Sequence, residues 1–284
     1  MKLVRFRYQN AVRLGVLQDE ATVVPLSEAY RGSMTAFLAE GTAALQRARE
    51  SLERTSVPLS EVQLLAPIAD PPKILCVGQN YRDHCEEQNQ PIPERPILFS
   101  KYATAINDPE GTISLLPGIS DQIDYEAELA VVIGKQGRHI SEAAAMEYVS
   151  GYLCANDVTA RDIQFGDKQW VRGKTPDGFF PIGPYLVTAD EIPDPHTLDI
   201  SLTLNGHVMQ RSNTSNLIFR IPYLISYFSR TMTLQPGDIL STGTPGGVGV
   251  FRNPPIFLKA GDVVAVTIQG LGTLRNFVHN PSQA

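Results

Sequence analysis

A succession of short apolar, β-branched runs with few helical segments between them is the feature that most constrains the fold. The runs lie at residues 74–77, 97–99, 129–133, 152–155, 198–204, 239–242 and 263–268. A doubly wound parallel sheet needs a helix between most consecutive strands, and this spacing does not provide one. We therefore predict an α+β, mainly β protein built on an antiparallel or mixed sandwich or barrel.

Turn and helix signals complete this prediction. Asn205-Gly206 separates two apolar runs and is typical of a hairpin turn, because both central residues of a type I′ turn need positive φ. A second turn is expected at Gly270-Leu271-Gly272. Helical patterns are confined to residues 141–149 and 216–230 in this part of the chain.

The first 66 residues have a different pattern. Strand-like runs at 2–6, 13–17 and 21–24 precede a helical pattern at 35–54, and the proline-marked stretch 66–72 follows. Prolines at such spacing indicate a linker or boundary. We predict a small N-terminal α+β domain at 1–66 and a catalytic domain at 70–281.

Charge and composition narrow the partners. The 284 residues carry 24 lysines and arginines against 30 aspartates and glutamates, a net charge of −6, and only three cysteines. A mildly acidic surface disfavours nucleic acid and anionic membranes, and few cysteines favour a reducing compartment. Because the N-terminus lacks the apolar stretch of a signal peptide, we predict no membrane association and a cytoplasmic location.

Three carboxylates stand at the ends of apolar runs. If the strand at 129–133 begins earlier, its period of two places Glu126 and Glu128 on one face, about 7 Å apart along the backbone. Asp157 ends the mostly apolar run 151–157. Three oxygen ligands would suit a hard ion such as Mg²⁺, Mn²⁺ or Ca²⁺. The alternative is a solvated strand end with two harmless glutamates and an ordinary turn aspartate.

Two further motifs could carry chemistry. His84 and Glu87 would be neighbours on a helix, where the carboxylate could orient an imidazole acting as a general base; the alternative is a surface contact. Thr244 lies in the glycine-rich stretch 242–249, which could approach a carboxylate closely or be only a tight loop. No Walker or dinucleotide-binding motif is present.

These motifs occur in an order that resembles the fumarylacetoacetate hydrolase superfamily. The matching blocks are residues 74–84, 126–134, 156–162 and 242–245, and the resemblance covers about residues 70–279. Residues 85–89, 168–170 and 249–252, with Pro254-Pro255, are similar to the fumarylacetoacetate hydrolase domain-containing protein 2 group. The resemblance implies a β-roll catalytic domain, a Mg²⁺ or Mn²⁺ site and a homodimer.

The resemblance also implies roles for individual residues. It makes Glu126, Glu128 and Asp157 metal ligands, with His84, Glu87 and Lys174 catalytic. Substrate-binding roles fall on Arg161, Gln164, Lys174 and Thr244. From the residues alone, Lys174 could equally lie on the surface and Arg161 pair with Asp162. A further aspartate ligand of the family has no counterpart at residues 77–80, where we expect water instead.

The substrates that this resemblance implies are small 2-oxo or 2,4-dioxo acids that form an enolate. We predict an oxaloacetate keto-enol tautomerase. The alternatives are a C–C bond hydrolase of acylpyruvates such as fumarylpyruvate and a 2-hydroxyhepta-2,4-diene-1,7-dioate isomerase. A hypothesis of another class is a binding module that keeps the fold without the chemistry, although no predicted base or ligand is missing.

Overall fold

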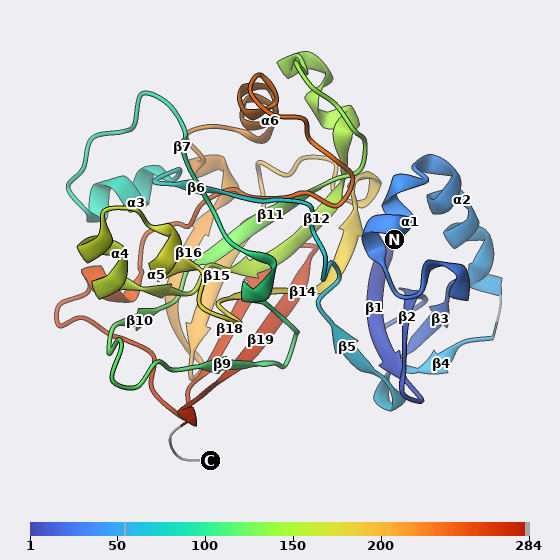
Figure 1. Cartoon of the computed structure of the whole chain (residues 1–284), viewed down its shortest axis with the longest axis horizontal. Helices are drawn as coiled ribbons and strands as arrows, with labels where there is room; N and C mark the ends of the chain where they lie inside the picture. The colour runs from blue at the N-terminus through green and yellow to red at the C-terminus, as the bar shows by residue number, and fades with distance from the viewer. Residues whose placement is uncertain (54, 282–284) are drawn as a thin grey trace.

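The computed structural model, which describes residues 1–53 and 55–281, consists mainly of β-strands with a few short helices (Figure 1). This confirms the predicted α+β, mainly β class. One large mixed sheet and one smaller sheet account for nearly all of the strands, and a short two-stranded pair stands apart from them.

The large sheet joins strands from both ends of the chain. Its order is β4 (Val57–Pro58), β3 (Thr22–Pro25), β2 (Ala11–Leu17), β1 (Lys2–Tyr8), β14 (Phe180–Thr188), β12 (Val149–Asn156), β11 (Ala127–Ile133), β17 (Ile239–Ser241), β6 (Ile74–Gly78) and β7 (Ile97–Ser100). Two more strands pair at its sides, β5 (Gln63–Leu65) with β1 and β8 (Ile106–Asn107) with β14.

The smaller sheet has the order β16 (His207–Asn213), β15 (Asp199–Leu204), β18 (Val263–Ile268), β19 (Gly272–His279) and β9 (Thr112–Ser114). The separate pair is β10 (Ile123–Asp124) with β13 (Thr159–Ala160). Asn205 and Gly206 have φ of 53° and 81°, which confirms the predicted hairpin turn between β15 and β16.

Short helices occupy the two ends of the large sheet. Figure 1 places α3, α4 and α5 together at the end away from α1 and α2. The α-helices are α1 (Met34–Ala39), α2 (Thr42–Glu50), α3 (Arg82–Glu87), α4 (Arg161–Asp167), α5 (Val171–Lys174) and α6 (Ile221–Ser229). The 3-10 helices are η1 (Glu28–Tyr30), η2 (Ser51–Glu53), η3 (Leu59–Glu61), η4 (Ala103–Ala105), η5 (Glu142–Tyr148), η6 (Ala189–Glu191), η7 (Thr214–Asn216) and η8 (Gly249–Phe251).

Among the described residues, no helix is long and apolar enough to cross a bilayer.

Three element predictions need correction. The helix expected at 35–54 is broken into α1 and α2, because Gly41 takes a φ of 62° that a continuing helix does not allow. Residues 142–148 of the segment 141–149 form a 3-10 helix, and only 221–229 of the segment 216–230 is α-helical. β14 was not predicted because Pro181 and Pro184 disfavour a central strand. Its ladder to β12 accommodates them with an irregular register.

β11 and β12 are buried on both faces. Leu129 and Val131 of β11 belong to a core shared with the smaller sheet and α6. Ala130 and Val132 belong to a second core, which also contains residues of β1, β2 and the helices α1 and α2. Because side chains alternate along a strand, Glu128 points to the same side as this second core.

The N-terminal segment continues the large sheet, since β1 pairs antiparallel with β14. Lys2 and Leu3 face Val187 and Leu186 in this ladder. The division of the chain at residues 66–70 therefore stays a prediction about domains, and the two parts share one sheet.

Candidate active site

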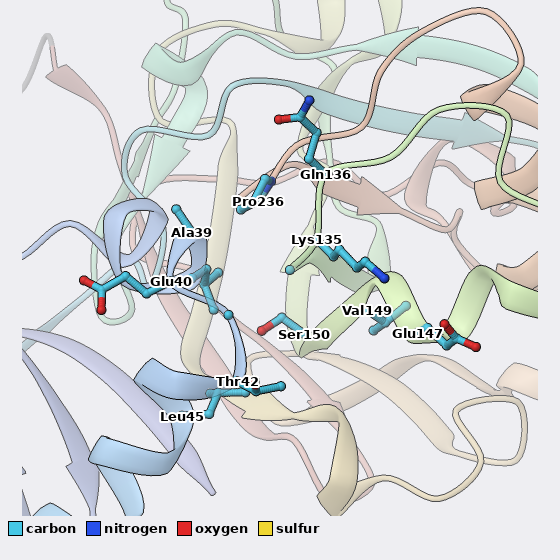
Figure 2. Close-up of a pocket in the computed structure, with 13 residues that line it drawn as sticks. Ala39, Glu40, Thr42, Leu45, Lys135, Gln136, Glu147, Val149, Ser150 and Pro236 are labelled. Atoms are coloured by element: carbon cyan, nitrogen blue, oxygen red, sulfur yellow. The ribbon is translucent and has the colours of Figure 1, made fainter.

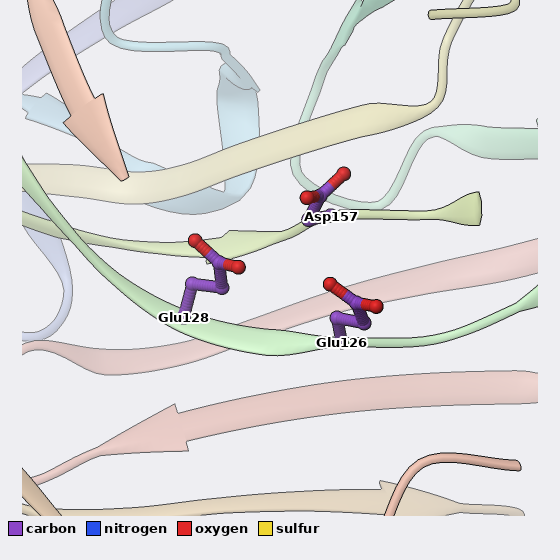
Figure 3. A group of neighbouring side chains, drawn as sticks. All are labelled: Glu126, Glu128 and Asp157. Carbon is purple, nitrogen blue, oxygen red and sulfur yellow. The ribbon is translucent and has the colours of Figure 1, made fainter. Parts of the chain in front are cut away.

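Three buried carboxylates meet where β11 begins and β12 ends. Figure 3 shows Glu126 and Glu128 on the same side of one strand, with Asp157 at the end of its neighbour. β11 and β12 pair with Glu128 opposite Ala155, and the amide of Asp157 donates to the carbonyl of Glu126 at 2.9 Å. One oxygen from each side chain lies within 4.8 Å of the others. The predicted alternative of a solvated strand end is wrong, because none of the three is more than 4% exposed.

Two buried lysines neutralise part of this charge. Lys174 Nζ lies 2.8 Å from Glu126 Oε2 and 2.9 Å from Asp157 Oδ2. Lys101 Nζ lies 2.7 Å from Asp157 Oδ1 and donates to the carbonyls of Val158 and Phe179. Lys174 is only 2% exposed, so the alternative of a surface lysine is wrong.

Arg161 completes the cationic side of the site. Its Nη1 lies 2.7 Å from Glu126 Oε1 and 3.0 Å from Gln164 Oε1, and its Nε donates to Asp124 Oδ2 at 2.8 Å. The predicted alternative pairing with Asp162 is wrong, since Asp162 accepts from the Ser120 hydroxyl instead. Although burial opposes ionisation, Lys174 and Arg161 lower the pKa of Glu126 to about 2.

Glu128 differs from the other two carboxylates. Its Oε2 accepts from the Ser241 hydroxyl and from the amide of Gly243. Within the part of the chain that the structure describes, no lysine or arginine lies within ion-pairing distance of it. Burial, together with the charges of Asp157 and Glu126, raises its pKa well above the usual value. This concentration of carboxylate charge fits a divalent cation, for which oxygen ligands are the preferred donors.

α3 brings the predicted base to the same place. His84 and Glu87 lie one turn apart on this helix, and His84 Nδ1 is 2.6 Å from Glu87 Oε1. Glu87 Oε2 in turn accepts from the amide of Gly247, which ties the helix to the glycine-rich loop. In the described residues, the other ring nitrogen of His84 has no protein partner. The alternative of a mere surface contact is wrong for His84, which is 6% exposed.

The glycine-rich loop holds Thr244 in a buried position. Gln210 Nε2 donates to the Thr244 hydroxyl at 2.8 Å and to the carbonyl of Pro245. Gln210 Oε1 accepts from the amide of Ala127 at 2.8 Å, so the Gln210 side chain connects the loop to the start of β11.

A cavity of about 180 Å³ connects these groups. It is lined by every predicted site residue except Glu87 and Asp157, which contact the lining residues His84 and Lys174 respectively. The other lining residues are apolar or carry a side-chain amide: Val77, Gly78, Gln79, Gln88, Phe99, Phe165, Trp170 and Phe251. The structure thus brings together all of the residues that the sequence singled out, and their individual roles remain proposals.

Two residues of the network were not predicted. Lys101 follows a short apolar run and carries no sequence signal of its burial. The Asp124 carboxylate accepts from Arg161 and from the amides of Gly249 and Val250. Asp124 belongs to the block around Glu126, so its position beside those glutamates was the one available signal.

A larger hollow lies elsewhere on the molecule. A crevice of about 730 Å³ separates the α1–α2 turn from the segment after β11 (Figure 2). Its charged lining residues, Glu40, Lys135 and Glu147, are solvent-accessible, and no carboxylate cluster of the described residues faces it. Volume alone therefore does not identify the candidate site.

Two family models and many named relatives match this chain. A family described as "Fumarylacetoacetate (FAA) hydrolase C-terminal" matches residues 73–279, and one described as "Rv2993c-like, N-terminal" matches residues 1–67. The relative "Oxaloacetate tautomerase fahd2, mitochondrial" from Xenopus laevis is 48% identical and covers 97% of this chain and 89% of its own length. The protein "Oxaloacetate tautomerase FAHD2A, mitochondrial" from Homo sapiens is 46% identical, with coverages of 98% and 91%.

Solved structures have the same fold over the whole chain. A fumarylacetoacetate hydrolase from Exiguobacterium antarcticum superimposes with a TM-score of 0.88 at 36% identity, covering 99% of each chain. A 2-hydroxyhepta-2,4-diene-1,7-dioate isomerase from Mycobacterium marinum gives 0.78 at 34% identity, again covering 99% of each.

These relatives overturn one prediction. The proteins from Xenopus laevis, Bos taurus and Homo sapiens are named as mitochondrial, which contradicts the predicted cytoplasmic location. The prediction depended on the lack of an apolar signal stretch. Mitochondrial targeting segments are amphipathic and arginine-rich, so that criterion could not exclude this compartment.

Fold, site and relatives converge on one family. The family model matches residues 73–279, and relatives at 46–48% identity match nearly the full length of the chain. Both findings assign the chain to the same family. The chain is therefore an enzyme of the fumarylacetoacetate hydrolase superfamily, similar to its domain-containing protein 2 group.

Proposed function

We propose that this enzyme is a divalent-metal-dependent oxaloacetate keto-enol tautomerase. The observation that carries the proposal is the buried group of Glu126, Glu128 and Asp157, next to a histidine base, in a chain whose relatives bear that name at 46–51% identity. Keto-enol exchange needs one proton taken from carbon and one given to oxygen, and this cavity holds groups for both steps.

Glu126, Glu128 and Asp157 would hold the ion, which we propose to be Mg²⁺ or Mn²⁺, with Ca²⁺ as a further possibility. When bound, a divalent ion supplies Lewis-acid stabilisation of the negative charge of an enolate. Since Glu128 has no cationic partner among the described residues, it is the ligand whose charge most needs such compensation.

His84 is the proposed base. Glu87 accepts from its Nδ1 and fixes the ring, which leaves Nε2 to take a proton from the methylene carbon of oxaloacetate. The same nitrogen can return that proton to the keto oxygen, so that the reaction is balanced without any other reactant.

Lys174, Arg161, Gln164 and Thr244 are the proposed substrate-binding groups. Lys174 and Arg161 place positive charge at the cavity wall, where a substrate carboxylate or a developing oxyanion would lie. Gln164 and Thr244 line the same cavity and can accept or donate hydrogen bonds to the substrate's oxygens.

An absorbance assay tests this proposal. Enol oxaloacetate is added to protein that has been loaded with Mg²⁺, and the decay of the enol band is followed alongside pyruvate release. We expect rapid loss of the band without pyruvate, and a return to the uncatalysed rate after chelation. Loss of the band at the uncatalysed rate in loaded protein would contradict the proposal.

A second candidate is hydrolysis of an acylpyruvate of the fumarylpyruvate type. The dyad of His84 and Glu87 could equally take a proton from water, and a maleylpyruvate hydrolase from Sphingobium has this fold at 31% identity. Stoichiometric pyruvate from an acylpyruvate would support it. The diene-dioate isomerase alternative is tested with that substrate by following the loss of its diene absorbance, since an isomerisation releases no pyruvate.

We also infer a homodimer. β7 is the edge strand of the large sheet, and Leu98 on it and Tyr102 after it are 40% and 61% exposed. An apolar edge strand favours pairing with another chain. Light scattering in solution should give twice the mass of one chain, and the mass of a single chain would contradict the inference.

A further inference from the structure

Trp170 forms a fixed wall of the cavity. It stands directly before α5, and its ring lies against Gly78 at the end of β6. The approach is so close that a β-carbon on Gly78 would come within 2.3 Å of the indole. The ring also meets Phe99 edge to face, with centroids 5.5 Å apart. Because strands support both neighbours, the indole has little room to move.

The same wall is linked to the chemistry. The amide of Lys174 donates to the carbonyl of Trp170 at 3.0 Å, which completes one helical turn between them. Lys174 Nζ is also 5.1 Å from the centre of the Phe99 ring. The position of the indole is thus set relative to the lysine that contacts Glu126 and Asp157.

Two other aromatic residues of the cavity are less restrained. Phe165 and Phe251 are 55% and 38% exposed, so packing holds their rings less firmly than the indole. Trp170 is partly buried in the core beside Phe99 and cannot turn away without opening that core.

We propose that Trp170, seated against Gly78, determines substrate length: the cavity admits a four-carbon 2-oxo dicarboxylic acid and excludes a seven-carbon one. This deepens the proposed function and rests on it. The cavity of about 180 Å³ is well below the roughly 300 to 1,000 Å³ of pockets for drug-sized ligands. On this proposal, the additional carbons of a seven-carbon diacid extend toward the indole, which cannot turn away.

Removal of the wall tests the proposal through a ratio of activities. The kcat/KM for oxaloacetate enol and for 2-hydroxyhepta-2,4-diene-1,7-dioate is measured for the metal-loaded wild type and Trp170→Ala. We expect the ratio to shift toward the longer acid by about 10- to 200-fold, the range for misfit in an apolar pocket. A general loosening of α5 would lower both activities and leave the ratio unchanged, which would overturn the proposal.

Variants guard against a folding defect. Trp170→Phe keeps an aromatic ring against Gly78 but is smaller, and should shift the ratio in the same direction by less. Phe277→Ala removes a 40% exposed aromatic side chain on β19 and should leave the ratio at the wild-type value. An equal shift in Phe277→Ala would overturn the proposal.

Binding gives a readout that does not depend on turnover. Trp170 is the only tryptophan of the chain, so its emission reports this wall alone. In wild-type protein with Mg²⁺, oxalate should change the emission at lower concentration than 2-oxoheptanedioate does. Equal affinity for the two acids would overturn the length limit.

The two proposals can fail separately. If loaded wild-type protein does not accelerate the loss of oxaloacetate enol, the proposed function fails. The order of binding affinities measured by emission in the wild type still decides whether the cavity beside Trp170 limits length.

Discussion

The surroundings of the two ends of β11 differ in buried charge and in the volume of the neighbouring cavity. At its start, Glu126 and Glu128 lie side by side (Figure 3). They line a cavity of about 180 Å³, and the buried Lys174 and Arg161 contact Glu126 there. Beyond its other end, at Gly134 and Lys135, a crevice of about 730 Å³ opens toward α1 and α2 (Figure 2). The larger space has no buried carboxylate cluster among the described residues.

The difference teaches that buried charge identifies the candidate site better than volume. Burying an unpaired carboxylate costs several kcal/mol of folding free energy. Glu128 is buried in this way, so its position is not explained by the stability of the fold. A wide, open crevice between two packed segments has no such cost. If buried charge identifies the active site, substitutions at the carboxylate cluster should change activity, and substitutions in the crevice should not.

The largest effect is expected for Glu128→Ala. Loss of a ligand should reduce metal-dependent turnover to background and abolish Mn²⁺ binding measured by calorimetry, while circular dichroism stays that of a folded protein. Glu110→Ala is the matched control, since Glu110 is half exposed and pairs with the exposed Arg275. Unchanged turnover in Glu128→Ala would remove the metal hypothesis.

The next effect is expected for His84→Ala. Loss of the base should lower kcat by about 10² to 10⁴-fold while the affinity for Mn²⁺ stays that of the wild type. Glu87→Gln, which keeps the shape of the side chain beside His84, should lower kcat by less. A parallel loss of metal affinity and rate in His84→Ala would show that His84 supports the metal ligands and is not the base.

A smaller effect, on stability alone, is expected at the crevice. Leu45 on α2 lines it and packs against the second core, so Leu45→Ala should lower the free energy of unfolding by about 1 kcal/mol. Urea unfolding measures this, and kcat/KM should remain unchanged. A loss of activity without a loss of stability would mean that the crevice takes part in the reaction.

The smallest effect is a pH dependence away from both regions. Burial lowers the pKa of His196 below its usual 6.5, with Arg220 in the same direction and Asp194 opposing. Its Nε2 accepts from the amide of Ile221 at the start of α6. Because the unfolded chain then binds the proton first, stability should be complete above pH 6.5 and fall as the pH decreases below it.

Thermal unfolding between about pH 8 and 5 measures this dependence. His196→Gln should show a flatter profile than wild type over that range. Parallel profiles would contradict the assignment to His196.

The strand pattern made much of the site predictable. The period of two places Glu126 and Glu128 together, and the apolar run of β12 ends at Asp157, so one antiparallel pairing joins all three. The helical spacing of His84 and Glu87 required only local structure. The resemblance supplied what spacing could not, namely the roles of Lys174 and Arg161.

Contacts between residues far apart in the chain could not be predicted from the sequence. Nothing near Lys101 indicates that it contacts Asp157, which is distant in the chain, and the partners of Asp124 lie in two other segments. β14 was missed because its prolines oppose a central strand, and only the ladder to β12 and β1 shows how they are accommodated.

Because residues of the N-terminal segment share the core on one face of β11, the first quarter of the chain cannot be deleted without consequence. A fragment that begins near residue 70 would present Ala130, Val132 and Leu153 to water, on the strand pair that carries the carboxylates. Such a fragment should aggregate during expression, and the intact protein should unfold in a single cooperative transition.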